Sequence, residues 1–259
     1  MASAPPSPRT VHLVLVEPAG PLNVGSVARL CANFGIGQLR LVAPRCDPLD
    51  PEALRMAVHG RPVLEAAPHF ASLADALADC GRVVATSGRR AGEPLPLEGP
   101  AQALDWLLAG GGNAPTALVF GREDRGLSNA ELLQAGRLLT LGTGPAYASL
   151  NLSHAAAVVL HELHGRRTLS AAGAAVAPGH GAAEDPAPRG ALEAGLADAQ
   201  ALLLEVGFLL PHTARARMAK LRALLQRAQV RPAELALLRG MVCQLRWASR
   251  RPCRPGQDH

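Results

Sequence analysis

Continuous apolar runs alternate with helical patterns from residue 11 to about residue 165. Five of these runs predict β-strands: VHLVLVE (11–17), QLRLVA (38–43), RVVAT (82–86), TALVF (116–120) and RLLTL (137–141). Because the runs are continuous rather than alternating, they are typical of parallel strands buried on both faces of a sheet. Helical patterns fall between and after them, near residues 23–34, 52–58, 72–79, 101–109, 128–135 and 150–164. This order of elements predicts an α/β domain over residues 11–167.

The helix expected at 23–34 is amphipathic, with Arg29 among its polar positions. Asn23 is expected to cap the start of this helix, and Gly35 to follow its end. An arginine on the polar side of a helix is an ordinary solvated residue, so Arg29 gains meaning only from other observations.

The chain changes character after the α/β domain. Residues 168–190, TLSAAGAAVAPGHGAAEDPAPRG, are dominated by Ala, Gly and Pro and predict a flexible linker. Residues 191–259 return to helical spacing, with Pro232 between two helical stretches, and predict a small all-helical extension. Residues 1–10 are expected to form a short disordered leader.

Positive charge is concentrated in the predicted extension. The net charge of the whole chain is +5, yet residues 211–254 hold eleven Lys and Arg side chains and the single acidic side chain Glu234. Such a stretch favours binding to a polyanion over a merely solvated helix surface. Aromatic residues make up only 3% of the chain, which disfavours base-stacking modules such as RRM and OB surfaces.

Several classes of protein are disfavoured by the remaining composition. The five cysteines are scattered without a C-x-x-C pair, so a disulfide framework or zinc site is not expected, and Cys31 and Cys80 are expected in the core. HELH (161–164) lacks the spacing that places two imidazoles on one helix face. No apolar run reaches the roughly 20 residues of a membrane span, so no membrane association and a cytoplasmic location are expected.

Three segments combine strand ends, glycines and polar residues. EPAGPLNVGSVARL (17–30) is a strand–turn–helix junction of the kind that presents backbone N–H groups to an anion, without a dinucleotide or Walker motif. LVFGREDRGLSNAEL (118–132) follows a buried strand, and Ser128 with Glu131 predicts a capping box. LGTGPAYASLNLSHAAAVV (141–159) leads into a helix that Ser149 is expected to cap, which leaves Asn151 unexplained.

In this order, NVGSVAR, LVFGREDRGLSNAE and YASLNLSHAAAVV resemble the three motifs of the SPOUT methyltransferases, in the TrmH family. The helical tail is similar to the extension of those members that 2′-O-methylate the ribose of cytidine or uridine 32 in the tRNA anticodon loop. The resemblance implies a parallel sheet whose C-terminal part threads a trefoil knot, a rare exception to unknotted folds. It also implies a homodimer with the active site at the subunit interface and tRNA as partner.

The resemblance implies S-adenosylmethionine as cofactor, S-adenosylhomocysteine as product and no metal. It places the cofactor contacts at Thr86, Ser87, Gly88, Gly121, Leu141, Ala148, Ser149 and Leu150. It places the catalytic group at Asn23, Arg29, Glu123, Ser149 and Asn151. The resemblance makes Arg29 the key residue, either as a clamp on the RNA phosphate or as the general base. Arg29 and the turn that precedes its helix are expected to bind the RNA backbone.

Alternative functions remain open from the sequence. A related enzyme could methylate ribosomal RNA or another tRNA position such as 18, and a catalytically idle protein could keep the fold and bind RNA. A nicotinamide-dependent oxidoreductase is disfavoured by the missing glycine fingerprint. The sequence does not distinguish cytidine from uridine as the target.

Overall fold

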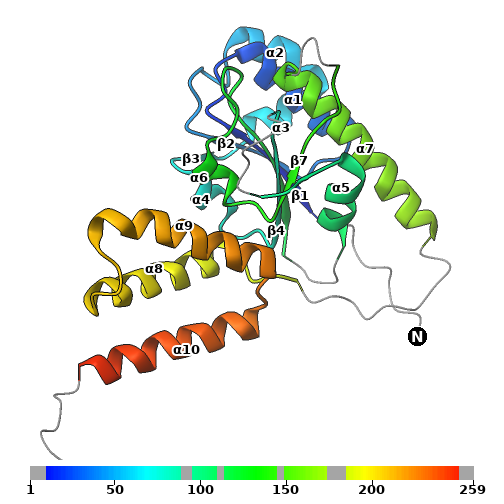
Figure 1. Cartoon of the computed structure of the whole chain (residues 1–259). Helices are drawn as coiled ribbons and strands as arrows, with labels where there is room; N and C mark the ends of the chain where they lie inside the picture. Colours follow the sequence, from blue (N-terminus) through cyan, green and yellow to red (C-terminus); the bar gives the residue numbers. More distant parts are fainter. Residues whose placement is uncertain (1–9, 89–94, 110–113, 145–148, 174–184, 251–259) are drawn as a thin grey trace, which may run out of the picture.

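A seven-stranded parallel sheet forms the centre of the α/β part of the molecule (Figure 1). The computed structural model describes residues 10–88, 95–109, 114–144, 149–173 and 185–250. The strand order is β3-β2-β1-β6-β4-β7-β5. The strands are β1 (Val11–Val16), β2 (Gln38–Val42), β3 (His69–Phe70), β4 (Arg82–Thr86), β5 (Leu97–Glu98), β6 (Thr116–Phe120) and β7 (Arg137–Leu139).

Helices cover both faces of this sheet. One face packs against α1 (Pro21–Asn33), α2 (Pro51–Ala57), α3 (Arg61–Glu65), α5 (Pro100–Leu108) and α7 (Leu152–Gly173), and the turn η1 (Val58–Gly60) joins α2 to α3. The other face packs against α4 (Leu73–Leu77) and α6 (Asn129–Leu132). The expected α/β class is therefore confirmed, and Cys31 and Cys80 are core residues as predicted.

The five predicted strands are all present, with ends that differ by at most two residues. The sequence missed the two-residue strands β3 and β5 and the short helix α3, because such short segments show no period. Both missed strands lie at edges of the sheet, where a short strand exposes little unpaired backbone. Within the described part of the chain, no helix is long and apolar enough to cross a membrane.

Two helix starts differ from the prediction. Gly20, not Asn23, precedes the first turn of α1, since Pro21 has the fixed φ and the missing N–H that suit a first helical position. Helix α7 begins at Leu152, and the Asn151 side chain, not that of Ser149, caps it by accepting from the Ser153 N–H at 2.9 Å. The predicted end of α1 is confirmed, because Gly35 follows the C-cap with φ +61°.

Helices occupy both ends of the segment 168–190 that the sequence predicts as a linker. Helix α7 continues to Gly173, and α8 (Arg189–Glu205) already starts at residue 189. Alanine is the strongest helix former, so the Ala-rich composition that suggested a linker is equally compatible with a longer helix. Residues 174–184 of the linker and residues 1–9 of the leader lie outside the described residues.

The extension consists of α8, α9 (Pro211–Ala228) and α10 (Pro232–Ser249), so it has a third helix beyond the two that Pro232 predicted. It attaches at the N-terminal end of β4: the N–H groups of Arg189 and Gly190 donate to the carbonyls of Cys80 and Ala78 at 3.1 and 3.0 Å. A buried ion pair of 3.2 Å joins Arg82 to Asp185 at the same place. The extension therefore lies at the edge of the sheet opposite the carboxyl ends of the strands (Figure 1).

His12 makes the stability of this fold sensitive to acid. Burial and the nearby Arg40 lower the pKa of His12 to about 4, against a smaller opposing effect of Asp79. Between about pH 6.5 and pH 4 the unfolded chain binds a proton that the folded chain does not, so stability falls as the pH is lowered through this window.

A His12→Asn variant, which does not titrate there, is expected to show a shallower loss of unfolding free energy between pH 7 and pH 4.5. The difference in slope should approach, and not exceed, about 1.4 kcal/mol per pH unit, the value for one proton. Urea unfolding of both proteins across this range measures it. Identical slopes would show that His12 does not cause the acid sensitivity.

Candidate functional site

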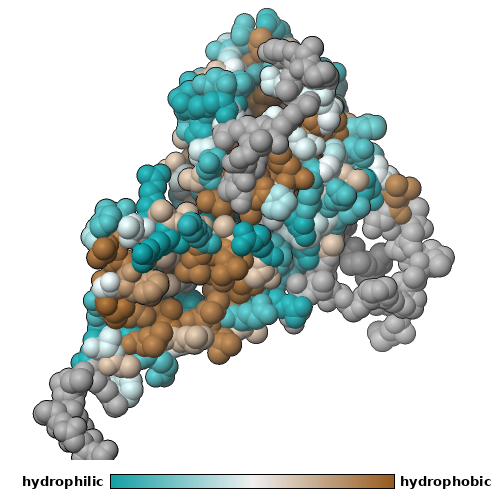
Figure 2. Space-filling model, viewed as in Figure 1, coloured by the Kyte–Doolittle hydropathy of each residue, from teal (hydrophilic) through white to brown (hydrophobic). Residues whose placement is uncertain are grey.

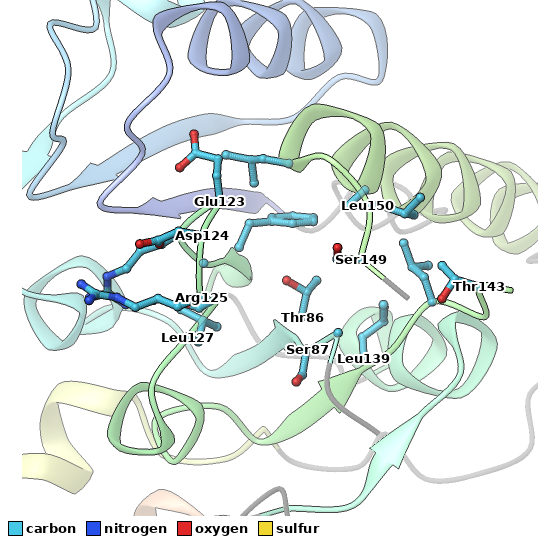
Figure 3. Close-up of a pocket in the computed structure, with 18 residues that line it drawn as sticks. Thr86, Ser87, Glu123, Asp124, Arg125, Leu127, Leu139, Thr143, Ser149 and Leu150 are labelled. Atoms are coloured by element: carbon cyan, nitrogen blue, oxygen red, sulfur yellow. The ribbon is translucent and has the colours of Figure 1, made fainter. Parts of the chain in front are cut away.

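A cavity of about 490 Å³ opens at the carboxyl ends of β4, β6 and β7 and beside the start of α7 (Figure 3). In parallel sheets the strand ends on one edge are the usual place for ligands. Seven of the eight predicted cofactor contacts line it: Thr86, Ser87, Gly88, Gly121, Leu141, Ser149 and Leu150. Ala148, the eighth, lies outside the described residues. The structure thus brings residues from three separate loops to one cavity.

The sequence missed the apolar wall of this cavity. Phe120, Leu127, Leu139 and Leu152 all line it, and the sequence pattern predicts the first three only as parts of strands or loops. The signal was available, because each predicted strand had to end at this edge of a parallel sheet. The cavity combines this apolar wall with polar side chains such as Thr86, Glu123 and Ser149, a combination found in small-molecule sites.

The loop after β6 folds back tightly on itself at Gly121. A Cβ atom at this position would lie 2.4 Å from the carbonyl carbon of Gly126, which is backbone and cannot swing aside. Gly126 has φ +67°, and its N–H donates to the Arg122 carbonyl at 2.9 Å. Both glycines are therefore needed for the shape of the cavity wall.

Arg122 holds the same loop through ion pairs. Its guanidinium binds both oxygens of Glu131 at 2.8 and 2.9 Å and also contacts Glu17. Glu131 caps α6 together with Ser128, which confirms the predicted capping box. The hydrogen bond from Arg122 lowers the pKa of Glu17, so this cluster stays ionised at neutral pH.

The anion at the first turn is a carboxylate of the chain itself. The N–H groups of Ala19 and Gly20 donate to Glu123 at 3.1 and 3.2 Å, at the start of α1. These two N–H groups are therefore occupied by Glu123 in this structure, and the prediction that the turn and Arg29 receive the RNA backbone stays a prediction. The carboxylate suits the positive end of the helix dipole, and it connects two predicted motifs that lie 103 and 104 residues apart.

A chain of hydrogen bonds joins all three motifs. Asn23 donates from Nδ2 to Glu123 at 3.2 Å and accepts through Oδ1 from Asn151 Nδ2 at 3.1 Å. Asn151 Oδ1 in turn accepts from the Ser153 hydroxyl at 2.7 Å at the start of α7. Four of the five predicted catalytic residues thus lie together. Ser149 and Glu123 line the cavity, Asn23 binds Glu123, and Asn151 binds Asn23.

Arg29 lies apart from this group in the single chain. It does not line the cavity, and six residues of helix separate it from Asn23, about 9 Å along the axis. Its side chain is exposed and, among the described residues, has no hydrogen-bond or ion-pair partner. Its backbone packs against η1, where a Cβ atom on Gly60 would lie 2.6 Å from the Arg29 Cα. The backbone of Arg29 is therefore closely packed, while its guanidinium is exposed to solvent.

The described residues contain no group of three or more His, Cys, Asp or Glu side chains that could hold a metal ion. Among the charged residues that line the cavity, Glu123 is bound by backbone N–H groups and Arg122 is paired with Glu131 and Glu17. Asp124 and Arg125 also line the cavity, so it offers charged groups as well as hydrogen bonds and apolar contacts to a ligand.

Residues 10–161 match the SpoU rRNA Methylase family, and residues 191–255 match the C-terminal domain of the tRNA methyltransferase TrmJ. The chain belongs to the SpoU methylase family. The two matched regions of this SpoU methylase correspond to the α/β domain and the basic extension.

Individual relatives agree with this assignment. This SpoU methylase is 35% identical to the tRNA (cytidine/uridine-2′-O-)-methyltransferase TrmJ of Cronobacter sakazakii, over 92% of this chain and 96% of the relative. It is similar to the crystal structure of TrmJ from Z. mobilis ZM4, with a TM-score of 0.78, 31% identity and coverage of 93% and 99% of the two chains. A structure described as concerning 2-OH methylation of C/U34 on tRNA has 30% identity and a TM-score of 0.50, and covers 62% of this chain and 99% of its own.

Proposed function

We propose that this SpoU methylase transfers a methyl group from S-adenosylmethionine to the ribose 2′-OH of cytidine or uridine 32 in the anticodon loop of tRNA. The observation that carries the proposal is the cavity: residues of the second and third motifs line it, and Asn23 of the first motif is hydrogen-bonded to Glu123 at its wall, in a chain similar to TrmJ along nearly its whole length. An enzyme with this substrate is expected to work in the cytoplasm.

The cavity fits the proposed cofactor. Its volume of about 490 Å³ is within the usual range for small-molecule sites. Phe120, Leu127 and Leu139 offer apolar surface for an adenine ring, and the strand ends at Thr86–Gly88 offer backbone groups for its edge. When bound, S-adenosylmethionine supplies an electrophilic methyl group on a sulfonium, and S-adenosylhomocysteine remains as product.

The chain's own residues position the reacting hydroxyl. Glu123 accepts hydrogen bonds from two backbone N–H groups and from Asn23. Its role is therefore to fix the loop after β6 in place rather than to act as a general base. Asn151, at the start of α7, is hydrogen-bonded to Asn23 and so holds the nearby Ser149 at the cavity. Much of the rate is expected from such positioning.

Arg29 is proposed to bind the phosphate beside the target ribose, so that a phosphate oxygen or a water accepts the proton of the 2′-OH. Arginine stays protonated in proteins, which favours the clamp over the general-base role. Because Arg29 is exposed and does not line the cavity of its own chain, we propose that it serves the cavity of a second subunit in a homodimer. Exposed apolar residues beside α1 and α7 suit such an interface: Leu22, Leu150 and Val158 are 45%, 43% and 46% exposed.

The trefoil knot implied by the resemblance is part of this proposal. The segment between β7 and α7 would form it, and residues 145–148 of that segment lie outside the described residues.

A second candidate is methylation at another tRNA position, such as 34. Similarity to the C/U34-related structure covers 62% of this chain, whereas similarity to the two TrmJ proteins also includes the extension. The extension therefore favours nucleotide 32.

Incubation with labelled S-adenosylmethionine and unmodified tRNA, followed by mass-spectrometric mapping, tests the proposed function. We expect one 2′-O-methyl group at nucleotide 32, and none on a matched tRNA carrying a 2′-deoxy sugar there. Methylation at 34 or in ribosomal RNA would replace the proposed substrate. No transfer together with no calorimetric binding of S-adenosylhomocysteine would indicate a catalytically idle RNA-binding protein.

A further inference from the structure

One end of the extension exposes apolar side chains that the fold does not use. Val206, Phe208 and Leu210, in the loop between α8 and α9, are 48%, 62% and 50% exposed. We call residues 206–210 the loop patch. Figure 2 shows extensive hydrophobic surface over the extension, bordered by hydrophilic residues. Phe208 is the most exposed member of the loop patch, and aromatic residues are scarce in this chain.

Phe208 is held in place rather than loosely exposed. The Arg217 guanidinium lies over its ring, 5.7 Å from the centroid, and the same side chain donates to the Phe208 carbonyl at 3.0 Å. These contacts fix both the ring and its backbone. The pair presents a flat aromatic group next to a cation that no described carboxylate neutralises.

The surroundings of the loop patch are basic. Arg215 and Lys220 on α9 are exposed and have no ion-pair partner within the described residues. The last turn of α10 is brought to the same end of the extension, because Arg250 binds Glu205, the last residue of α8, at 3.0 Å. An exposed ring among unneutralised cations is the combination that proteins use to bind unpaired nucleotides.

We propose that Phe208, backed by Arg217, stacks on an unpaired base of the RNA substrate. The inference rests on the proposed function for the identity of the RNA, and it assigns a contact far from the reacting ribose, since the extension lies opposite the cavity. A second copy of the chain is the other occupant to consider for an apolar patch. The eleven basic residues against one acid in 211–254 favour a polyanion over a second copy with the same charge.

The test compares Phe208→Ala, Phe208→Leu and Phe208→Tyr by anisotropy titration of labelled, unmodified tRNA, without cofactor. Loss of a stacked base is expected to raise the Kd about 5- to 150-fold for Ala. The Leu variant keeps apolar area without an aromatic face and should resemble Ala, whereas Tyr should bind like the wild type. Binding of a fully paired RNA duplex of equal length should be unaffected by all three changes.

Salt dependence separates stacking from charge. Phe208→Ala should leave the slope of log Kd against log salt unchanged, because stacking releases no counterion. Arg215→Gln is the matched charge control and should reduce that slope. Leu245→Ala removes an equally exposed apolar side chain elsewhere in the extension and should not change tRNA affinity.

Wild-type tRNA affinity in the Ala variant, or wild-type affinity in Leu with loss in Ala, would overturn the proposal. So would a change in oligomeric state on light scattering with tRNA affinity unchanged, since that would indicate a second copy at the patch. If the wild type binds tRNA but transfers no methyl group, the proposed function fails, and the Phe208 comparison still holds because it is read from binding alone.

Discussion

An Arg29→Ala variant is expected to lose methyl transfer by roughly 10²- to 10³-fold, the range for removing one group that stabilises charge in a transition state. Its affinity for S-adenosylmethionine should stay close to that of the wild type. The reason is geometric: the side chain is exposed, lines no part of the cavity and makes no described contact whose loss would disturb the fold. Single-turnover rates and calorimetry with S-adenosylhomocysteine measure the two quantities separately.

Arg55 supplies the matched control. It is an exposed arginine on α2, the helix that packs closely against α1 where a Cβ on Gly25 would lie 2.1 Å from the Ala53 carbonyl oxygen. Arg55→Ala removes the same charge nearby and should alter the rate only slightly. Full activity of the Arg29 variant would show that the role given to Arg29 is wrong.

Arg29→Lys distinguishes the two roles left open for this residue. A lysine still binds phosphate as a point charge, so a clamp should keep part of the rate with little dependence on pH. A general base must lose its proton, so a lysine in that role should give a rate that rises steeply toward pH 10. The pH profile of the Lys variant therefore decides between clamp and base.

The sequence predicted what depends on local pattern. Each buried strand appeared as a continuous apolar run, and the capping box at Ser128 followed from two residues three apart. The proposed cofactor contacts came from the resemblance, and the parallel strand ends explain why seven of them line one cavity. The partner of Glu123 could not be predicted. No local pattern indicates which helix start will donate its backbone N–H groups to a carboxylate more than 100 residues away.

The caps show the same limit on a smaller scale. Ser149 and Asn151 are both good N-cap residues, and local preference cannot rank them. In the structure Asn151 is the cap. Its side-chain oxygen accepts from the first turn of α7, and its amide nitrogen donates to Asn23. The polar residue within an apolar run is therefore the one that links the start of α7, through Asn23, to Glu123 in the loop after β6.

Gly121→Ala is expected to abolish cofactor binding under ordinary assay conditions. The added Cβ would lie 2.4 Å from the Gly126 carbonyl carbon, so the loop that forms the cavity wall must move. Overpacking of this kind costs about 1–3 kcal/mol, and a displaced loop adds the loss of its own contacts with the ligand. Gly142→Ala, where an added Cβ meets nothing within 4 Å, is the control and should bind S-adenosylhomocysteine normally. Wild-type affinity in the Gly121 variant would remove this loop from the cofactor site.

The two inactive variants together test whether the site is shared between subunits. When Arg29→Ala and Gly121→Ala chains are co-expressed with different tags, a mixed dimer pairs an intact cavity in one subunit with an intact Arg29 in the other. If Arg29 serves the partner's cavity, half the dimers are mixed and each has one working site, which restores about a quarter of wild-type activity. If Arg29 serves its own cavity, every chain in the mixture lacks one of the two parts and no activity returns. Because Arg29 is exposed and does not line the cavity of its own chain, recovery is the expected result.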